Sequence, residues 1–476
     1  MKKLLRILSI CLLLAGMLNH QPFPASAGET AIGFAEAWQK IAKENDTLAA
    51  ARENLDQARH KKDAAQDLYM PEIAVSANYM RLNDEVTLSP NDILESMPAG
   101  NRLAPLLEGM GRSYGLSGSA LNEAFTSTIA ERNNRSSRVS GSWPIYAGGR
   151  IDAAQDIAAG QEKEAGEKLN MSRQEQFENA TRQYFGAVLA RLVANTKGEL
   201  EHGLKQHFDH ALLLEQQGQI AKVERIQAEA AYDKAKVEHR KARRDLEIAV
   251  IALTRLLKSS EPVIPTDALF VQCTLPPLAT FLEQTLSDSP GLAVLKAKQH
   301  QAAGLATVEE GKYYPTVALF GNYSLYEEDD LAGKILPDWV VGIGLKIPIL
   351  ERSGRSGNLK AAKSAIRQLE HLQSQAESDL AVLVEKTYRQ AEQAVEEYQG
   401  LGSSLTLAEE TVSLRSKSFQ QGLATSLDVV DAETFLAGIK IQRAASVYRY
   451  VIALAKLLAL SGQMETFFSY QLSQAL

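Results

Sequence analysis

The sequence predicts a mainly α-helical chain with transmembrane β-strands, in which very long helices pair as coiled coils and four short strands join a shared sheet. Three observations lead to this prediction. The stretches 150–216 and 359–421 contain no proline. Four short segments alternate apolar residues with small or polar ones, which is typical of strands. Aromatic residues make up only 7% of the chain, as is usual for long helices. The net charge is −7 and both signs are interspersed along the chain. The sequence therefore lacks the basic stripe that a nucleic-acid partner would require.

Residues 1–27 have the three parts of a secretory signal peptide. A basic start is followed by an apolar run at 7–18 and by small residues at a cleavage site, 25–27. Cys11 lies inside the apolar run and lacks the small residue that precedes a lipidated cysteine, so we expect no lipid anchor. The mature chain would then keep one cysteine, Cys273, which cannot form an internal disulfide.

The rest of the chain contains one pattern twice. The segment Tyr69–Val75 recurs at Tyr313–Leu319, 244 positions later, whereas Tyr184 and Tyr388 lie only 204 positions apart. The first copy therefore carries 40 extra residues between its strands, within 86–132. Prolines and leucines in 88–131 suggest short helices and turns there. The expected divisions are a first repeat at 28–260, an equatorial linker at 261–289, a second repeat at 290–462 and a C-terminal tail at 463–476.

Each copy is expected to contribute two strands. Ile73, Val75 and Tyr79 alternate with small or polar residues, and Val341, Ile343 and Leu345 do the same in the second copy. This period of two marks a strand with one apolar face, and about ten residues suffice to cross a membrane in a barrel. The strands are expected at about 71–82, 135–145, 315–326 and 338–348.

Four strands cannot close a membrane barrel, because the smallest known examples have about eight. An open sheet edge in lipid would leave N–H and C=O groups without partners. If these strands are transmembrane, several chains must therefore share one barrel. A soluble hairpin is the alternative for any single pair of strands, but four strands in one secreted chain favour the barrel.

Two long helices are expected after each strand pair, at about 150–216 and 222–257 and at about 356–420 and 425–460. A helix of the first length spans roughly 100 Å at 1.5 Å per residue, far more than a globular helix. Spacings of four and three residues, typical of coiled coils, occur in the shorter helix of each copy: Leu246, Val250, Leu253 and Leu257, then Tyr450, Leu454 and Leu457.

Glycines and prolines lie where the chain is expected to change direction. Gly218 and Gly422 fall between long helices, where a hairpin needs a left-handed residue, and Thr425 and Ser426 can cap the helix that follows. At the strand-to-helix junctions, proline has no N–H for the ladder and glycine permits a sharp turn. The junction residues are Pro144, Gly148 and Gly149 in the first copy and Pro348 and Gly354 in the second.

Together these features resemble the TolC family of outer-membrane efflux proteins over nearly all of the mature chain. The most specific stretch is 422–433, which is similar to the family's periplasmic tip; the segments after Pro144 and Pro348 are similar to its swivel from strand to helix. The resemblance implies a homotrimer with a 12-stranded barrel in the outer membrane and a helical tunnel across the periplasm. It also implies contact with outer-membrane lipid, a periplasmic adaptor (membrane fusion) protein and an inner-membrane pump, in tripartite efflux or type I secretion, with no enzymatic activity and no cofactor.

The resemblance places a gate at the tip. Asp428 and Asp431 lie three residues apart and so share a helix face; three chains would set six carboxylates around one axis, which would attract cations. The alternative is that Asp428 only complements the helix dipole. The first copy has Glu224 and Gln227 at the matching positions.

This chain departs from the family's pattern at the tip. The type member has an arginine there that holds the tip shut, whereas this chain has Ala424. Lys222 and Arg225 in the first turn are the candidates to replace that arginine.

Other classes of protein fit the sequence less well. No motif of a serine hydrolase, zinc protease or phosphate-binding loop occurs. His207 and His210 share a helix face, but nothing nearby completes a tetrahedral metal set, so a solvated face is expected. A periplasmic coiled-coil adaptor would need a β-rich block between the halves of its hairpin, which this chain lacks. The cargo is not indicated by any motif.

Overall fold

The computed structural model describes residues 30–272, 274–327 and 337–472. The expected signal peptide, 1–27, and Cys273 lie outside these residues. The described chain forms two compact units. The helical unit comprises the described parts of Met1–Asn54, Gly166–Ala293 and Ser374–Leu476, and the sheet unit comprises Leu55–Ala165 with the described part of Val294–Gln373.

Four helices begin in one unit and end in the other: α3 (Asp46–Gln66), α7 (Arg150–Gln216), α10 (Pro290–Gly311) and α12 (Arg355–Gln420). Of these, α7 has 67 residues and α12 has 66. Each is roughly 100 Å long at 1.5 Å per residue. The prediction of helices far beyond globular length is confirmed.

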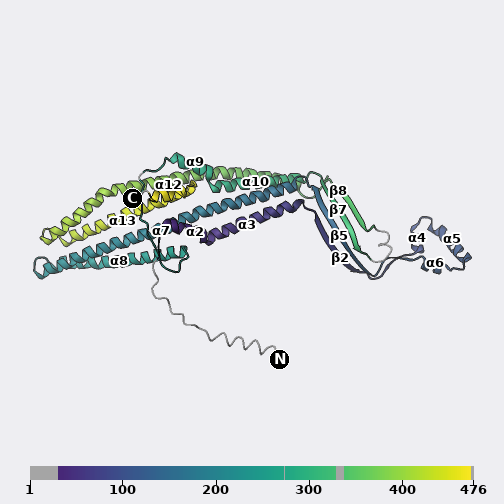
Figure 1. The fold of residues 1–476 in the computed structure, drawn as a ribbon, viewed down its shortest axis with the longest axis horizontal. Coiled ribbons are helices and arrows are strands. Elements are labelled where there is room, and N and C mark those ends of the chain that lie inside the picture. The colour runs from purple at the N-terminus through teal and green to yellow at the C-terminus, as the bar shows by residue number, and fades with distance from the viewer. Residues whose placement is uncertain (1–29, 273, 328–336, 473–476) are drawn as a thin grey trace, which may run out of the picture. The chain divides into compact units, whose positions relative to one another are not determined.

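Two helical hairpins dominate the helical unit. α7 is followed by α8 (Lys222–Leu256), and α12 is followed by α13 (Ser426–Leu460); Figure 1 shows the turns of both hairpins at the same end of this unit. Leu253 and Leu257 in the first hairpin and Tyr450, Leu454 and Leu457 in the second are all at most 2% exposed. Leu246 and Val250 are only half-buried, so the coiled-coil spacing identified five core residues correctly out of seven.

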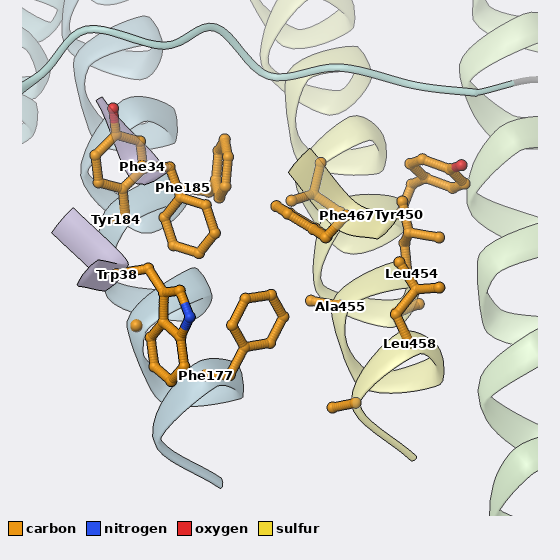
Figure 2. Close-up of a cluster of buried hydrophobic side chains, with 14 of the residues drawn as sticks. Phe34, Trp38, Phe177, Tyr184, Phe185, Tyr450, Leu454, Ala455, Leu458 and Phe467 are labelled. Carbon is orange, nitrogen blue, oxygen red and sulfur yellow. The ribbon is translucent and has the colours of Figure 1, made fainter. Parts of the chain in front are cut away.

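An aromatic core stabilises the helical unit (Figure 2). Phe34 on α2 (Phe34–Glu44) lies with its ring centroid 5.9 Å from that of Phe177 on α7 and 5.3 Å from that of Phe467 on α14 (Thr466–Leu472). Such pairs attract beyond their burial. The described part of the C-terminal tail expected at 463–476 contains α14, and Phe467 is fully buried among these rings.

The segment expected as a linker, 261–289, forms β6 (Val263–Pro265) and α9 (Leu278–Asp288), and β6 pairs in parallel with β1 (Thr30–Ile32). Just beyond β6, the Asp267 carboxylate accepts a hydrogen bond from the Phe34 N–H at 2.6 Å. Since Gly33, at the N-cap of α2, has no side chain to do this, a residue 233 positions away caps the helix.

The sheet unit contains one four-stranded antiparallel sheet in the order β2-β5-β7-β8, so the inner pair joins the two repeats. The pleat exposes the apolar side chains that the alternation placed on one face: Ile73, Val75 and Ile343 are each at least 70% exposed. β2 and β8 are the edges of this sheet. The strands are β2 (Glu72–Arg81), β5 (Asn133–Tyr146), β7 (Thr316–Tyr326) and β8 (Trp339–Lys346).

The 40 additional residues of the first repeat form a small module between β2 and β5. As expected from the sequence, it consists of short helices and turns. Ser89 and Asp92 form a capping box at its first helix. Its elements are β3 (Val86–Leu88), α4 (Pro90–Ser96), α5 (Gly100–Ser113), α6 (Gly118–Ala124) and β4 (Ser127–Ala130); a 3-10 turn, Asp67–Tyr69, precedes β2.

Candidate functional site at the helical turns

Both hairpins end in the same kind of turn. Gly218 and Gly422 have φ of +68° and +69°, as the sequence predicted. In the first turn the N–H of Gln219 donates to the Leu214 carbonyl and that of Gly218 to the Glu215 carbonyl, both at 2.9 Å. In the second, the N–H of Leu423 donates to the Ser418 carbonyl at 2.8 Å. This is the Schellman arrangement, which satisfies the last carbonyls of a helix and favours glycine.

The helix after the second turn begins with a capping box. Thr425 Oγ1 accepts from the N–H of Asp428 at 3.3 Å, and the Asp428 carboxylate accepts from the N–H of Thr425 at 2.9 Å. Bonds from the Thr425 hydroxyl and N–H, assisted by Arg415, lower the pKa of Asp428. Thr425 is therefore the cap, as expected.

Ser426 does not cap its own helix, contrary to the expectation. It is fully buried and connects the two hairpins. Its N–H donates to the Glu224 carboxylate at 2.6 Å, and its hydroxyl lies 2.7 Å from Nε2 of His207. Glu224 thus satisfies the first turn of α13 from the neighbouring hairpin, where a carboxylate is favoured by the helix dipole.

His207 belongs to this junction and not to a solvated face, which corrects the expectation from the sequence. It is 5% exposed, and its ring packs edge-on against Phe419 with centroids 4.5 Å apart. His210 is exposed. The spacing of Leu200, Leu204, His207 and Ala211, which is four, three and four, would have indicated a core position for His207.

Acidification should loosen the junction at Ser426. Burial, and then repulsion by His210, lower the pKa of His207 from 6.5 to about 4. The unfolded chain takes up this proton between about pH 6.5 and pH 4, whereas the folded chain does not; stability is therefore present at neutral pH and is lost as the pH falls through that window. The protection of amide hydrogens in 200–230 and 415–435, measured as the exchange rate relative to the unfolded chain at the same pH, should fall accordingly.

The matched variant for this prediction is His207→Gln, which keeps a polar side chain that does not titrate in this range. It should remove most of the pH dependence of this protection in both segments. An unchanged slope in the variant would show that another group controls the junction.

The candidates to replace the missing arginine at the tip behave differently. Arg225 donates its Nε–H to Glu215 at 2.8 Å and also pairs with Glu229, so it is committed within its own hairpin. Lys222 is exposed. Ala424 lies beside the small cluster of Phe419 and Val429. Apolar packing and the Ser426 bonds therefore join the turns within one chain.

The two aspartates of the second turn have unequal surroundings. Asp428 is held by the capping box and lies 3.1 Å from Arg415. A role at the start of its helix is the alternative to the gate that the sequence left open. Asp431 is exposed, and within the described chain it forms no ion pair. Of the two aspartates, Asp431 is the more exposed.

At the strand-to-helix junctions the glycines adopt the conformation that was expected. Gly148, Gly149 and Gly354 have φ of +66°, +75° and +65°. Pro348 follows the end of β8.

Pro144 does not end its strand, contrary to the prediction. β5 continues to Tyr146 and contains a bulge directly after Pro144. The pairing of β5 with β2 has already ended at Ser142, so Pro144 lies at an edge, where a missing N–H is tolerated.

Across the residues that the structure describes, no helix carries an apolar run long enough to cross a membrane. In the same residues, no three His, Cys, Asp or Glu side chains are grouped closely enough to hold a metal ion.

Comparison with known proteins gives consistent results. Residues 37–258 and 281–463 match the model of a family described as outer membrane efflux protein. Cobalt-zinc-cadmium resistance protein CzcC of Cupriavidus metallidurans is 27% identical over 233 residues, which are 47% of this chain and 53% of CzcC, so the match spans about half of that relative.

Two solved structures share the fold over almost the whole chain. CusC has a TM-score of 0.72 at 15% identity, covering 93% of this chain and 95% of CusC. VceC of Vibrio cholerae, an outer membrane protein, has a TM-score of 0.70 at 14% identity, covering 90% of this chain and 96% of VceC.

Proposed function

Because the chain belongs to the outer membrane efflux protein family, we propose that three copies form one passive duct from the periplasm to the cell exterior. The observation that carries the proposal is the sheet β2-β5-β7-β8, which has an apolar face and two edge strands. Four strands per chain are too few to close a barrel, and three chains would supply twelve. Each open edge would then pair with the next chain, as lipid requires.

The mass of the detergent-extracted protein tests this proposal. We expect a heat-resistant species of about three times the 52.0 kDa of the chain that requires detergent for extraction, as a shared barrel does. A monomer or dimer released with the soluble periplasmic fraction would contradict the duct.

We propose that the turns dock onto a periplasmic adaptor that is connected to an inner-membrane pump, which supplies the energy. Leu423 and Leu427 in the second turn and Val223 in the first are 77%, 52% and 55% exposed, and clustered exposed apolar side chains mark binding surfaces. Leu423→Asp should reduce recovery of the co-purified adaptor while leaving the mass of the extracted protein unchanged. If the variant and the unsubstituted protein recover equal amounts of adaptor, Leu423 is not part of the docking surface.

Asp431 is proposed as the carboxylate of the narrow end. In a trimer, three copies would surround one axis and attract cations. Asp431→Asn should lower the preference of single channels for cations over anions. Asp428→Asn is the matched control: it should weaken the helix cap by about 1 kcal/mol with little effect on ion preference. The reverse pattern would place Asp428 in the channel.

Divalent metal cations are the cargo that we propose to test first, because the curated relative is named for cobalt, zinc and cadmium resistance. Deleting the gene should lower tolerance to salts of these metals. If the deletion lowers tolerance to hydrophobic dyes but not to metal salts, the proposal of a metal cargo is wrong and the proposal of a duct is unaffected.

A further inference from the structure

One face of α8 is charged and exposed, and its contacts within the chain stay on its own helix: Lys236 Nζ lies 5.8 Å from the centre of the Tyr232 ring, and Arg240 Nε donates to the Lys236 carbonyl. Asp233, Lys236, Arg240, Arg243 and Glu247 recur at spacings of three and four residues, which is the spacing of a coiled-coil contact line. We call them the α8 seam. All five are exposed, and within the described chain none forms an ion pair. The three central side chains are positive.

A second exposed line lies on α12. It consists of Glu396, Gly400, Ser403, Leu407 and Glu410, again at spacings of four and three, and we call it the α12 seam. All five are exposed, and Leu407 is 62% exposed. No ion pair of Glu396 or Glu410 occurs in the described residues. Both seams are therefore accessible to another molecule.

Gly400 leaves open space on the α12 seam, and Gly402 and Gly438, which lie outside the seam, are equally open. Glycine inside a helix costs about 1 kcal/mol relative to alanine, so its presence usually serves a close approach. Yet a Cβ built on Gly400 would meet nothing within 4 Å in this chain. No group of the chain itself requires glycine at this position.

The two seams lie at the same height above the turns. Ser426 and Glu224 are hydrogen-bonded, which sets the two turns level with each other. Arg240 is 22 residues after Gly218, and Gly400 is 22 residues before Gly422. Counted from the glycine of the nearer turn in the same way, Arg243 lies 25 residues away and Glu396 lies 26. Lys236 lies 18 residues away and Ser403 lies 19. Equal rise per residue keeps these pairs level in antiparallel helices.

We infer that the α8 seam of one copy packs antiparallel against the α12 seam of the next copy. Arg243 then faces Glu396 across the interface, and the long side chain of Arg240 occupies the space over Gly400. The inference rests on the proposed threefold assembly, because only a symmetry axis along the helices keeps the turns of all copies level. The one pair of opposite charges at matched heights, Arg243 and Glu396, favours this order and register of the chains.

Disulfide formation between copies tests the inference in the full-length protein extracted from the membrane. In a Cys273→Ser background, Lys236→Cys combined with Ser403→Cys should give covalent dimers and trimers on oxidation. Lys236→Cys combined with Ser413→Cys is the control: Ser413 is exposed on the same helix but ten residues nearer the turn, which moves it roughly 15 Å along the axis. It should give no cross-link.

Charge reversal provides a second measurement. Arg243→Glu should lower the temperature at which the extracted trimer dissociates, and adding Glu396→Arg in the same chain should restore it. Gly400→Ala should also lower that temperature, although alanine favours the helix.

A trimer of the expected mass that gives no cross-link and no charge rescue would overturn the paired seams and leave the duct intact. Absence of any trimer from the unsubstituted protein would overturn the proposed function itself. Cross-linking of Lys236→Cys to a different protein would assign the α8 seam to that partner instead.

Discussion

Replacing Gly148 with alanine should prevent most of the protein from reaching its heat-resistant form. The residue has φ of +66°, and an added Cβ would lie 2.6 Å from the carbonyl oxygen of Gly311 and 3.0 Å from Cβ of Tyr314. A left-handed conformation costs a non-glycine residue about 1–2 kcal/mol, and the forced movement of backbone adds about 1–3 kcal/mol. Both costs apply at the junction between β5 and α7.

The neighbouring glycine is the matched control. Gly149 has φ of +75°, but nothing lies within 4 Å of its added Cβ. Gly149→Ala should therefore show only the conformational cost of about 1–2 kcal/mol. The measurements are the yield of the heat-resistant form and its dissociation temperature. Equal losses in both variants would mean that the approach to Gly311 is not a constraint.

Tyr184→Phe should destabilise the helical unit by about 1–3 kcal/mol, because the Asp267 N–H would lose its partner. The other groups keep a second bond: Thr266 N–H with the Ile32 carbonyl, and the Asp267 carboxylate with the Phe34 N–H. The hydroxyl lies 2.8 Å from the Ile32 carbonyl oxygen and 3.0 Å from the Asp267 carboxylate. It also accepts from the N–H groups of Thr266 and Asp267, both at 3.2 Å. Burial raises the pKa of Tyr184 to about 12, so it remains a neutral donor.

Tyr388, the counterpart in the second repeat, provides the comparison. It is also buried, at 8% exposure, and its ring packs near Phe281 with centroids 6.0 Å apart. No such cluster of backbone groups surrounds its hydroxyl in the described chain. Tyr388→Phe should change the thermal transition by less than about 1 kcal/mol. Similar losses at both positions would mean that the ring and not the hydroxyl matters.

These two tyrosines show what a repeat pattern can predict. The spacing of 204 residues correctly identified equivalent positions, because both rings lie in the core. It could not show that one hydroxyl is bonded to a distant β-strand, since β6 and Asp267 have no counterpart in the second copy. Local periodicity predicts burial, whereas a long-range hydrogen bond depends on which elements happen to meet.

Predictions of glycines in the left-handed region were the most reliable. The positive φ of Gly218 and Gly422 follows from helix geometry alone. The junction at Ser426 could not be predicted in the same way, because its partners lie 202 and 219 residues away. Asp428 illustrates a third case: the sequence allowed a cap or a channel carboxylate, and the bonds to Thr425 show that it caps the helix.

The position of Phe467 has a consequence for how the protein is made. Phe34 and Phe467 pack together in one core, although almost the whole chain separates them. A chain exported from its N-terminus therefore cannot complete this core until its last helix has crossed the inner membrane. Contacts so distant in sequence form late and slowly, and the apolar surface of the early helices stays open meanwhile. Completion of the aromatic core around Phe34 thus depends on α14.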